Sequence, residues 1–390
     1  MQSLLKKMNG RARSINSRQH DCLRLVRVST REEFSTLEHE WDVLINSSQT
    51  PSPFMSWDYL DVWWQVYGSL GYDVHLYIAR DENGKLIGAV PLMVTQRGAF
   101  PGARGKFRHL AFMGGVGEML GESLELPALY GYERSIGKAA AKLILGTLQG
   151  KWEVLYFYLV PKQSISTNTM LKELSNAGIA VQTTHSLASP FLNTSNSNWE
   201  EYLSKRSKSF RKNVRYGESS ATRKYGMKRI QAGKDISYRN GIKQLTRLSS
   251  LRWGNDIKAF HTPEFIEFHN KLAPRFGEKN QLSFSFMELD GQIAGGLYDF
   301  VFDNKMWGYQ APWDSNFSKA SPGFLLNVWS IRECFELGLR EFHTLPGNTE
   351  YKEGWTDHQH TLNMYEAACP DGLGGALFTI ARGIDRLLLK

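Results

Sequence analysis

The stretch FSKASPGFLLNVWSIRECFELGL, residues 317–339, has the pattern of a helix with a marked beginning and end. Ser321 is a preferred N-cap residue, and Pro322 suits the first helical position, where no backbone N–H is needed. Gly338 is the residue expected just beyond the last turn. The apolar face between them consists of Phe324, Leu325, Val328, Ile331 and Phe335. The stretch therefore predicts a helix over 322–337.

The start of this helix also has features of a phosphate site. A helix N-terminus presents N–H groups and the positive end of a dipole, which favours a nearby anion by about 0.3–1 kcal/mol. Lys319 adds a full positive charge, and Gly323 permits close approach of the backbone. In the alternative interpretation, Ser321 satisfies the N–H groups and the helix is simply well capped. The stretch alone leaves both interpretations open.

Periodicity and turn residues predict further helices and strands around this stretch. Expected helices lie near 31–45, 52–68, 133–149, 165–177, 199–225, 237–252 and 263–276, and at the C-terminal tail. Expected strands lie at 23–29, 74–80, 85–95, 107–115, 152–160, 227–232, 282–289, 292–302, 305–311, 340–345 and near 359–369.

The same order of elements occurs twice: strand, two helices, three antiparallel strands, helix, strand. The glycines of GKLIGA (84–89) and GQIAGG (291–296) match in spacing. The sequence therefore predicts a mixed α/β protein with two tandem domains, over 21–190 and 191–390. A chain of 390 residues also favours two domains. Residues 1–20 form a basic stretch that we expect to be a disordered tail. Alternatively, this stretch binds a membrane surface or nucleic acid.

The overall composition narrows the partners and the compartment. The 47 Lys and Arg against 39 Asp and Glu favour anionic partners, such as phosphorylated cofactors, nucleic acid or anionic lipid. The three cysteines fit neither a disulfide framework nor a zinc knuckle, so we expect a cytoplasmic protein without a metal. The sequence contains no apolar run near the roughly 18 residues that span a bilayer.

Four stretches carry a resemblance to a known family: PFMSWDYLDVWW (53–64), DGQIAGGLYDF (290–300), residues 321–345 and GNTEYKEGW (347–355). Together with the element order, they resemble the GNAT superfamily of acyl-CoA N-acyltransferases. More narrowly, they look like the acetyltransferase group associated with cellulose and exopolysaccharide biosynthesis. That group is similar to the Fem-type aminoacyltransferases, which carry two GNAT-like halves. The resemblance implies two tandem GNAT-like domains packed together.

The resemblance implies that the second half binds an acyl donor, with acetyl-CoA as the first expectation, and that the first half is structural or binds the acceptor. The pyrophosphate would lie in the loop before residue 322, and the strand 305–311 would offer main-chain groups to the pantetheine arm. The family's Gly-rich loop is replaced here by NFSKASPG, which has a single Gly. The expected donor-binding residues are Gln310, Ala311, Ser318, Lys319, Ser321, Gly323, Phe324 and Leu325.

N-acylation requires a neutral amine, so a base and an acid are sought among the titratable residues. Tyr351 follows the last core strand, where GNAT enzymes often keep an acid. Asp299 interrupts an apolar strand and is either a site residue or on a wet face. His343 is a candidate base or an ordinary strand histidine, and Glu350 is a further candidate in the loop.

Basic residues are expected on the acceptor side. The stretch 205–229 carries ten basic residues and one acid. These basic side chains either form a solvent-exposed helix face or contact a ligand. The ligand would be the cofactor's 3′-phosphate, an anionic acceptor or tRNA. The expected acceptor contacts are Lys208, Arg211, Arg215, Arg252, Trp253, Lys352 and Trp355.

Three functions remain open at this point. The first is direct acyl transfer from acyl-CoA to an amine on a small molecule, glycan or peptide, in exopolysaccharide or cell-envelope synthesis. The second is a Fem-like aminoacyltransferase, the only reading with a tRNA partner. The third is a non-catalytic binding module of a synthesis complex, at the membrane surface or elsewhere. No DNA partner is expected, because regularly spaced aromatic residues for stacking on bases are absent.

Overall fold

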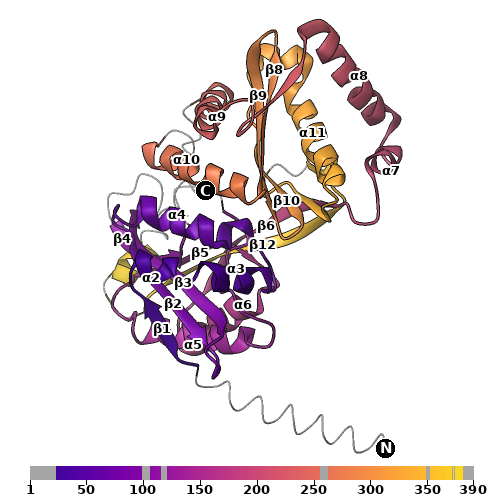
Figure 1. The fold of residues 1–390 in the computed structure, drawn as a ribbon. Helices are drawn as coiled ribbons and strands as arrows, with labels where there is room; N and C mark the ends of the chain where they lie inside the picture. Colours follow the sequence, from indigo (N-terminus) through magenta and orange to yellow (C-terminus); the bar gives the residue numbers. More distant parts are fainter. Residues whose placement is uncertain are drawn as a thin grey trace, which may run out of the picture. The chain divides into compact units, whose positions relative to one another are not determined.

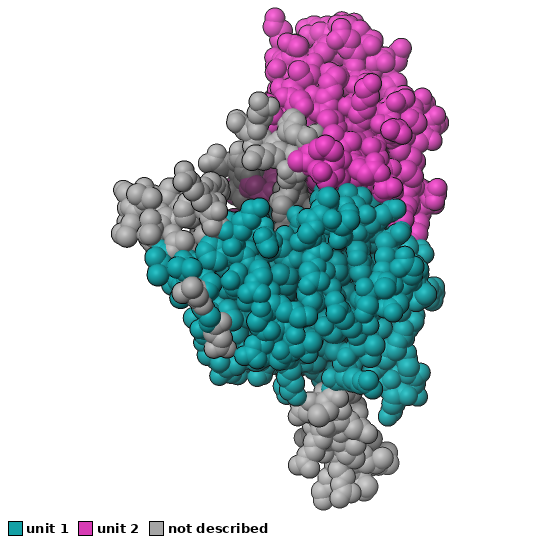
Figure 2. Space-filling view, turned by 90° about the vertical axis from the view of Figure 1, so that its left-hand side faces the viewer, with its two compact units in different colours: residues 1–116, 121–186, 362–390 teal, residues 117–120, 187–361 magenta. Residues whose placement is uncertain are grey.

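The computed structural model describes residues 23–98, 106–115, 121–254, 262–347, 352–370, 372 and 374–380. The chain divides into two units, which Figure 2 distinguishes by colour. Unit 1 contains residues 1–116, 121–186 and 362–390, and unit 2 contains residues 117–120 and 187–361. The predicted tail over 1–20 lies outside the described residues. Within the described residues, no helix is both long and apolar enough to cross a bilayer.

Unit 1 contains a mixed sheet. Its strands are β1 (Leu25–Val28), β2 (Asp73–Arg80), β3 (Leu86–Gly98), β4 (Lys106–Phe112), β5 (Val154–Pro161) and most of β12 (His358–Ala368). They lie in the order β1-β2-β3-β4-β5-β12, and β4 with β5 is the parallel pair. From Leu362 to Ala368, β12 pairs antiparallel with β5. Residues 362–390 thus group with unit 1, whereas the sequence analysis counted them in the second domain. Such a pairing between distant parts of the chain leaves no local pattern.

The helices of unit 1 are α2 (Arg31–Ser35), α3 (Glu38–Asn46), α4 (Trp57–Tyr67), α5 (Glu133–Leu145) and α6 (Ile165–Asn176). The single helix predicted over 31–45 is therefore two helices. The hydroxyls of Ser35 and Thr36 donate to the carbonyls of Glu32 and Glu33. Such local hydrogen bonds compete with the helical pattern, which explains a break at this point.

Unit 2 also contains both parallel and antiparallel strands. Its strands are the end of β6 (Gln182–Asn193), β7 (Lys228–Gln231), β8 (Leu282–Leu289), β9 (Gln292–Phe302), β10 (Lys305–Gln310) and β11 (Glu341–His343). They lie in the order β6-β11-β10-β9-β8-β7, with β10 and β11 parallel. The strand β6 was not predicted, because its sequence QTTHSLASPFLN is largely polar and contains Pro190.

Helices cover the sheet of unit 2 on both faces (Figure 1). They are α7 (Trp199–Ser204), α8 (Lys208–Tyr225), α9 (Tyr238–Trp253), α10 (Pro263–Glu278) and α11 (Pro322–Glu336). The helices α8 and α11 lie on one side of β8 and β9, and α9 and α10 lie on the other. The predicted helix over 322–337 is confirmed by α11, which carries much of the unit's core. Its buried apolar side chains are Leu325, Leu326, Val328, Trp329, Ile331 and Cys334.

The helix α11 ends just before Gly338, the glycine that the sequence predicts beyond its last turn. Gly338 has a φ of 64° in the left-handed region that favours glycine. The Gly338 N–H donates to Phe335 O at 3.0 Å, and the Leu339 N–H donates to Cys334 O at 3.0 Å. This is the hydrogen-bond pattern of a Schellman motif, which satisfies the last helical carbonyls. Cys334 and Leu339 are both buried in the same apolar cluster, so the end of the helix is also fixed by packing.

A glycine in α5 allows the close packing of α5 on α6. A Cβ atom added at Gly137 would lie 2.3 Å from Ser166 O and 2.7 Å from Thr169 Cβ. We expect Gly137→Ala to destabilise the fold by about 1–3 kcal/mol, because overpacking against a backbone outweighs the roughly 1 kcal/mol that Ala gains in a helix. Scanning calorimetry measures the shift in melting temperature. Arg134→Ala, at an exposed position of α5, should change stability by less than about 0.5 kcal/mol. A Gly137→Ala variant as stable as the parent protein would contradict this packing argument.

Candidate active site

A cavity of about 700 Å³ lies in unit 2, where the first turns of α11 face β9 and β10. Of the eight residues that the sequence analysis assigned to the acyl donor, six line it: Gln310, Ala311, Ser318, Ser321, Gly323 and Phe324. The other two do not line it. Lys319 is exposed, and Leu325 is fully buried in the core beneath the helix.

The cavity opens where two parallel strands separate. The strands β10 and β11 are paired over 305–307 and 341–343. The residues Gly308 to Gln310 at the end of β10 line the cavity, as do Ala311 just after it and Thr344 just after β11. The register between β9 and β10 also shifts between Gly308 and Gln310. Bulges of this kind are frequent beside active sites, where they redirect side chains.

A stripe of small and polar residues on α11 forms one wall. Gly323, Asn327 and Ser330 recur at the i, i+4, i+7 spacing that aligns residues on one helix face, and all three line the cavity. Asn327 Nδ2 donates to Gly323 O at 2.8 Å. Asn327 and Ser330 were not among the predicted site residues, although their spacing on an otherwise apolar helix is visible in the sequence.

Ser321 begins α11 in an unusual conformation. Its backbone is left-handed, with φ 52° and ψ 51°, and its side chain makes no capping hydrogen bond. Ser321 thus occupies the predicted N-cap position, but the alternative in which its hydroxyl satisfies the first N–H groups is not what the structure shows. A non-glycine residue in this region costs of order 1–3 kcal/mol and often marks a functional site. Here the uncommon conformation occurs at a residue that lines the cavity.

Aromatic side chains make up much of the apolar wall. A Cβ atom added at Gly323 would lie 2.7 Å from Trp313 Nε1, so the glycine leaves room for the Trp313 indole. The Arg252 guanidinium carbon lies 4.6 Å from the centroid of the Trp313 ring, a cation–π contact. Arg252 and Trp253, two of the predicted acceptor contacts, line the cavity at the end of α9.

The most distinctive polar group in the cavity is the carboxyl of Asp299. This side chain lines the cavity, yet it is only 1% exposed. Ser330 Oγ, from α11, donates a hydrogen bond to Asp299 Oδ2. Burial raises the pKa of Asp299 to about 7, although the hydrogen bond from Ser330 acts in the opposite direction. The sequence left open whether Asp299 is a site residue or lies on a solvent-exposed face of the sheet. Its burial excludes the solvent-exposed face.

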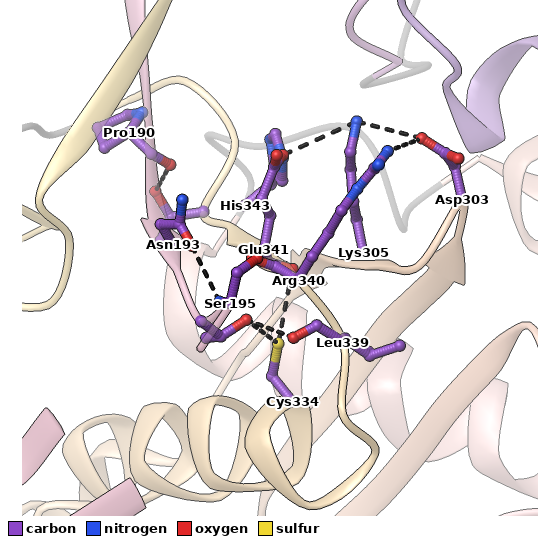
Figure 3. A network of polar contacts seen from close by, with 12 residues as sticks. Pro190, Asn193, Ser195, Asp303, Lys305, Cys334, Leu339, Arg340, Glu341 and His343 are labelled. Carbon is purple, nitrogen blue, oxygen red and sulfur yellow. Dashed lines mark hydrogen bonds and ion pairs between the residues drawn. The ribbon is translucent and has the colours of Figure 1, made fainter. Parts of the chain in front are cut away.

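His343 lies elsewhere, and Figure 3 shows its surroundings. Phe342 and Thr344 line the cavity, so alternation along the strand directs His343 to the opposite face of the sheet. Its Nε2 lies 2.7 Å from Glu341 Oε2, and its ring stacks on Trp307. Burial lowers the pKa of His343 to about 4. His343 is not brought together with Asp299 in the cavity.

The remaining predicted acceptor contacts divide into two groups. Lys352 and Trp355 line the cavity and also support its wall. Lys352 Nζ donates to the carbonyls of Leu345 at 2.6 Å and Pro346 at 3.1 Å, and Trp355 is only 3% exposed. The three predicted contacts on α8 do not line this cavity. Arg211 and Arg215 line a smaller cavity of about 350 Å³ beside α7, and Lys208 is exposed.

The two candidate catalytic residues Glu350 and Tyr351 lie outside the described residues. Their roles stay predictions from the sequence. Other cavity residues escaped the sequence analysis because nothing local distinguishes them. Tyr309, Trp313 and Phe342 are aromatic residues of a kind that ordinarily belongs to a core, and only the folded chain brings them to the same cavity.

Comparisons with known proteins bear on this site. Residues 208–353 match the family model described as an acetyltransferase (GNAT) domain, and they include β9, β10 and α11. The search of curated proteins gives no match.

Similar solved structures extend over nearly the whole chain. FemX has a TM-score of 0.59 at 10% identity, covering 92% of this chain and 99% of that one. L-PGS from Bacillus licheniformis has a TM-score of 0.50 at 10% identity, covering 89% and 96%. A conserved protein of unknown function from Bacteroides thetaiotaomicron also has a TM-score of 0.50 at 10% identity, covering 89% and 99%. The predicted mixed α/β fold of GNAT and Fem type is confirmed, and the match to the acetyltransferase (GNAT) domain model lies over residues 208–353.

Proposed function

We propose that unit 2 transfers an acyl group from acyl-CoA to an amine by direct attack, without a covalent acyl-enzyme. The observation that carries the proposal is a buried carboxyl, Asp299, inside a cavity of about 700 Å³ that adjoins the start of α11. That volume lies in the range of about 300–1,000 Å³ typical of small-molecule sites. The acetyl group is our first choice of acyl group.

The donor would lie along α11 and β10. The positive end of the α11 dipole and the polar groups around Ser318 and Ser321 suit a pyrophosphate. The main chain of β10 beyond its last pairing with β11 suits the amide groups of a pantetheine arm. A role in exopolysaccharide or cell-envelope synthesis, in the cytoplasm where acyl-CoA is made, is part of the proposal and depends on the sequence resemblance.

Asp299 would act as the general base. An amine with a pKa near 10.4 costs about 4.6 kcal/mol to deprotonate at pH 7. A base with a pKa near 7 is suited to accept that proton. The amine nitrogen then forms a bond to the thioester carbonyl carbon, the C–S bond breaks, and the thiolate leaves with the electron pair. The nitrogen loses its second proton as the amide forms, and this proton goes to the departing thiolate. The first proton remains on Asp299 until it passes to water.

A Fem-like aminoacyltransferase is the second candidate. It is favoured by the likeness of fold to FemX and by the exposed basic residues of α8, such as Lys208 and Arg215. Binding of tRNA that weakens steeply with added salt would support it. Indifference to tRNA at low salt, together with binding of acyl-CoA, would leave the first candidate.

Titration calorimetry with acetyl-CoA and longer acyl-CoAs tests the donor directly. We expect one molecule to bind per chain. A folded protein that binds none of these thioesters would refute the proposal. Detection of an acylated product from a set of amines would distinguish an enzyme from a non-catalytic binding module.

A charge placed at Ser321 should test the phosphate contact. We expect Ser321→Asp to weaken acyl-CoA binding roughly 10–100-fold, because a carboxylate repels the phosphates at close range. Ser321→Asn is the matched control, since it has nearly the same shape without the charge. Both residues tolerate a left-handed backbone better than serine does, and both can cap the helix. Calorimetry measures both affinities, and equal weakening in the two variants would show that charge is not the cause.

Loss of the carboxyl at Asp299 should remove the base. We expect Asp299→Asn to lower kcat about 10²–10⁴-fold while the Kd for acyl-CoA changes little. Because the base is active when ionised, activity of the parent protein should rise with pH through about 7. That rise should be absent in the residual activity of the variant. Asp290→Asn, at the exposed turn between β8 and β9, is the control. A variant with an unchanged pH profile would exclude Asp299 as the base.

A further inference from the structure

Three residues of unit 2 form a compact group of metal-ligand types away from the cavity. They are Glu341 and His343 of β11 and His360 of β12, and their ligand atoms all lie within 4.8 Å of one another. Glu341 and His343 are two residues apart on one strand, so both point to the same face of the sheet. His360 reaches them from β12, and β6 is the strand between β12 and β11.

Stacked rings hold the two imidazoles in place. The His343 ring lies against Trp307, with centroids 4.3 Å apart and planes at 19°. The His360 ring lies against Phe191, with centroids 4.3 Å apart and planes at 6°. The two imidazole centroids are 5.5 Å apart. Ligand side chains restrained in this way lose little conformational freedom when they bind a metal.

We propose that Glu341, His343 and His360 bind a first-row divalent cation, with Zn²⁺ as the best fit. Two imidazoles and one carboxylate form the ligand set of zinc sites that keep a further position for water. His343 Nε2 and Glu341 Oε2 are already 2.7 Å apart, and the cation would take the place of the proton between them. The neutral His343 ring would then carry its proton on Nδ1.

The charge states of the ligands suit a cation. Burial holds the pKa of His343 at about 4, so the imidazole is neutral at pH 7. The hydrogen bond from His343 and the charge of Lys305 hold the pKa of Glu341 at about 2 despite its partial burial. A neutral imidazole and an ionised carboxylate are the forms that bind metal.

Lys305 and Arg340 place positive charge near Glu341 and oppose a cation here. Lys305 Nζ lies 3.8 Å from Glu341 Oε2 and 3.3 Å from Asp303 Oδ2 (Figure 3). Asp303 also accepts a hydrogen bond from Arg340 and remains available to Lys305 when Glu341 turns to a metal. Lys305 should therefore lower the affinity for the metal without blocking the site. The site is independent of the proposed acyl transfer, because it lies on the face of β11 opposite the cavity.

Zn²⁺ binding to the full chain, free of any purification tag, tests the proposal. We expect one Zn²⁺ per chain by competition with a chromophoric chelator, and visible absorption typical of a nitrogen and oxygen site when Co²⁺ is added. Mg²⁺ should not compete, because it prefers sites made of oxygen ligands alone. His360→Ala and Glu341→Gln should each weaken Zn²⁺ binding roughly 100-fold or more. Lys305→Met should strengthen it about tenfold, because it removes a like charge.

Controls separate this site from unspecific binding by surface histidines. His185→Ala, at an exposed position of β6, should leave the affinity unchanged. His343→Ala removes a buried ring, so circular dichroism must first show that the variant is folded; His360→Ala and Glu341→Gln decide the question if it is not. The proposal fails if the parent protein binds no Zn²⁺ at micromolar concentrations, or if His360→Ala and Glu341→Gln bind it as tightly as the parent.

Discussion

The hydrogen bond from Ser330 Oγ to Asp299 Oδ2 joins α11 to β9 in the buried interior of unit 2. A carboxyl in this position is costly to ionise, and burial accordingly raises its pKa. The serine donor stabilises the ionised form and limits that rise. The helix also packs on the sheet through its buried apolar residues, and its residues Asn327 and Gly323 form a wall of the cavity. One hydrogen bond therefore links α11 to β9 and also affects the ionisation of the carboxyl in the cavity.

Those features of unit 2 that depend on neighbouring residues could be predicted from the sequence. Pro322 and Gly338 mark the ends of α11 because each satisfies a backbone requirement within one turn. The hairpin of β8 and β9 follows from the Asp290–Gly291 turn in the same way. Six of the eight residues assigned to the donor line one cavity because they come from two short stretches that the helix and the strand hold together.

Features that depend on the order of strands in space could not be predicted in this way. The sequence suggests that Asp299 is unusual, but its partner Ser330 becomes visible only when α11 is placed on β9. The group of Glu341, His343 and His360 requires β6 between β11 and β12, and β6 itself was missed because its residues are largely polar. The pattern H-x-H at 358–360 was a local sign, but it is common on solvated strands.

The alternation of side chains along β11 separates two candidate bases, His343 and Asp299. Phe342 and Thr344 contribute to the cavity, so Glu341 and His343 face away from it. For His343 to accept a proton from an amine in the cavity, the proton would have to cross the sheet. Its ring is also enclosed by Trp307 and Phe191, and burial makes it a weak base at neutral pH. Asp299 lines the cavity and has a pKa of about 7, and for these two reasons we propose it, rather than His343, as the base.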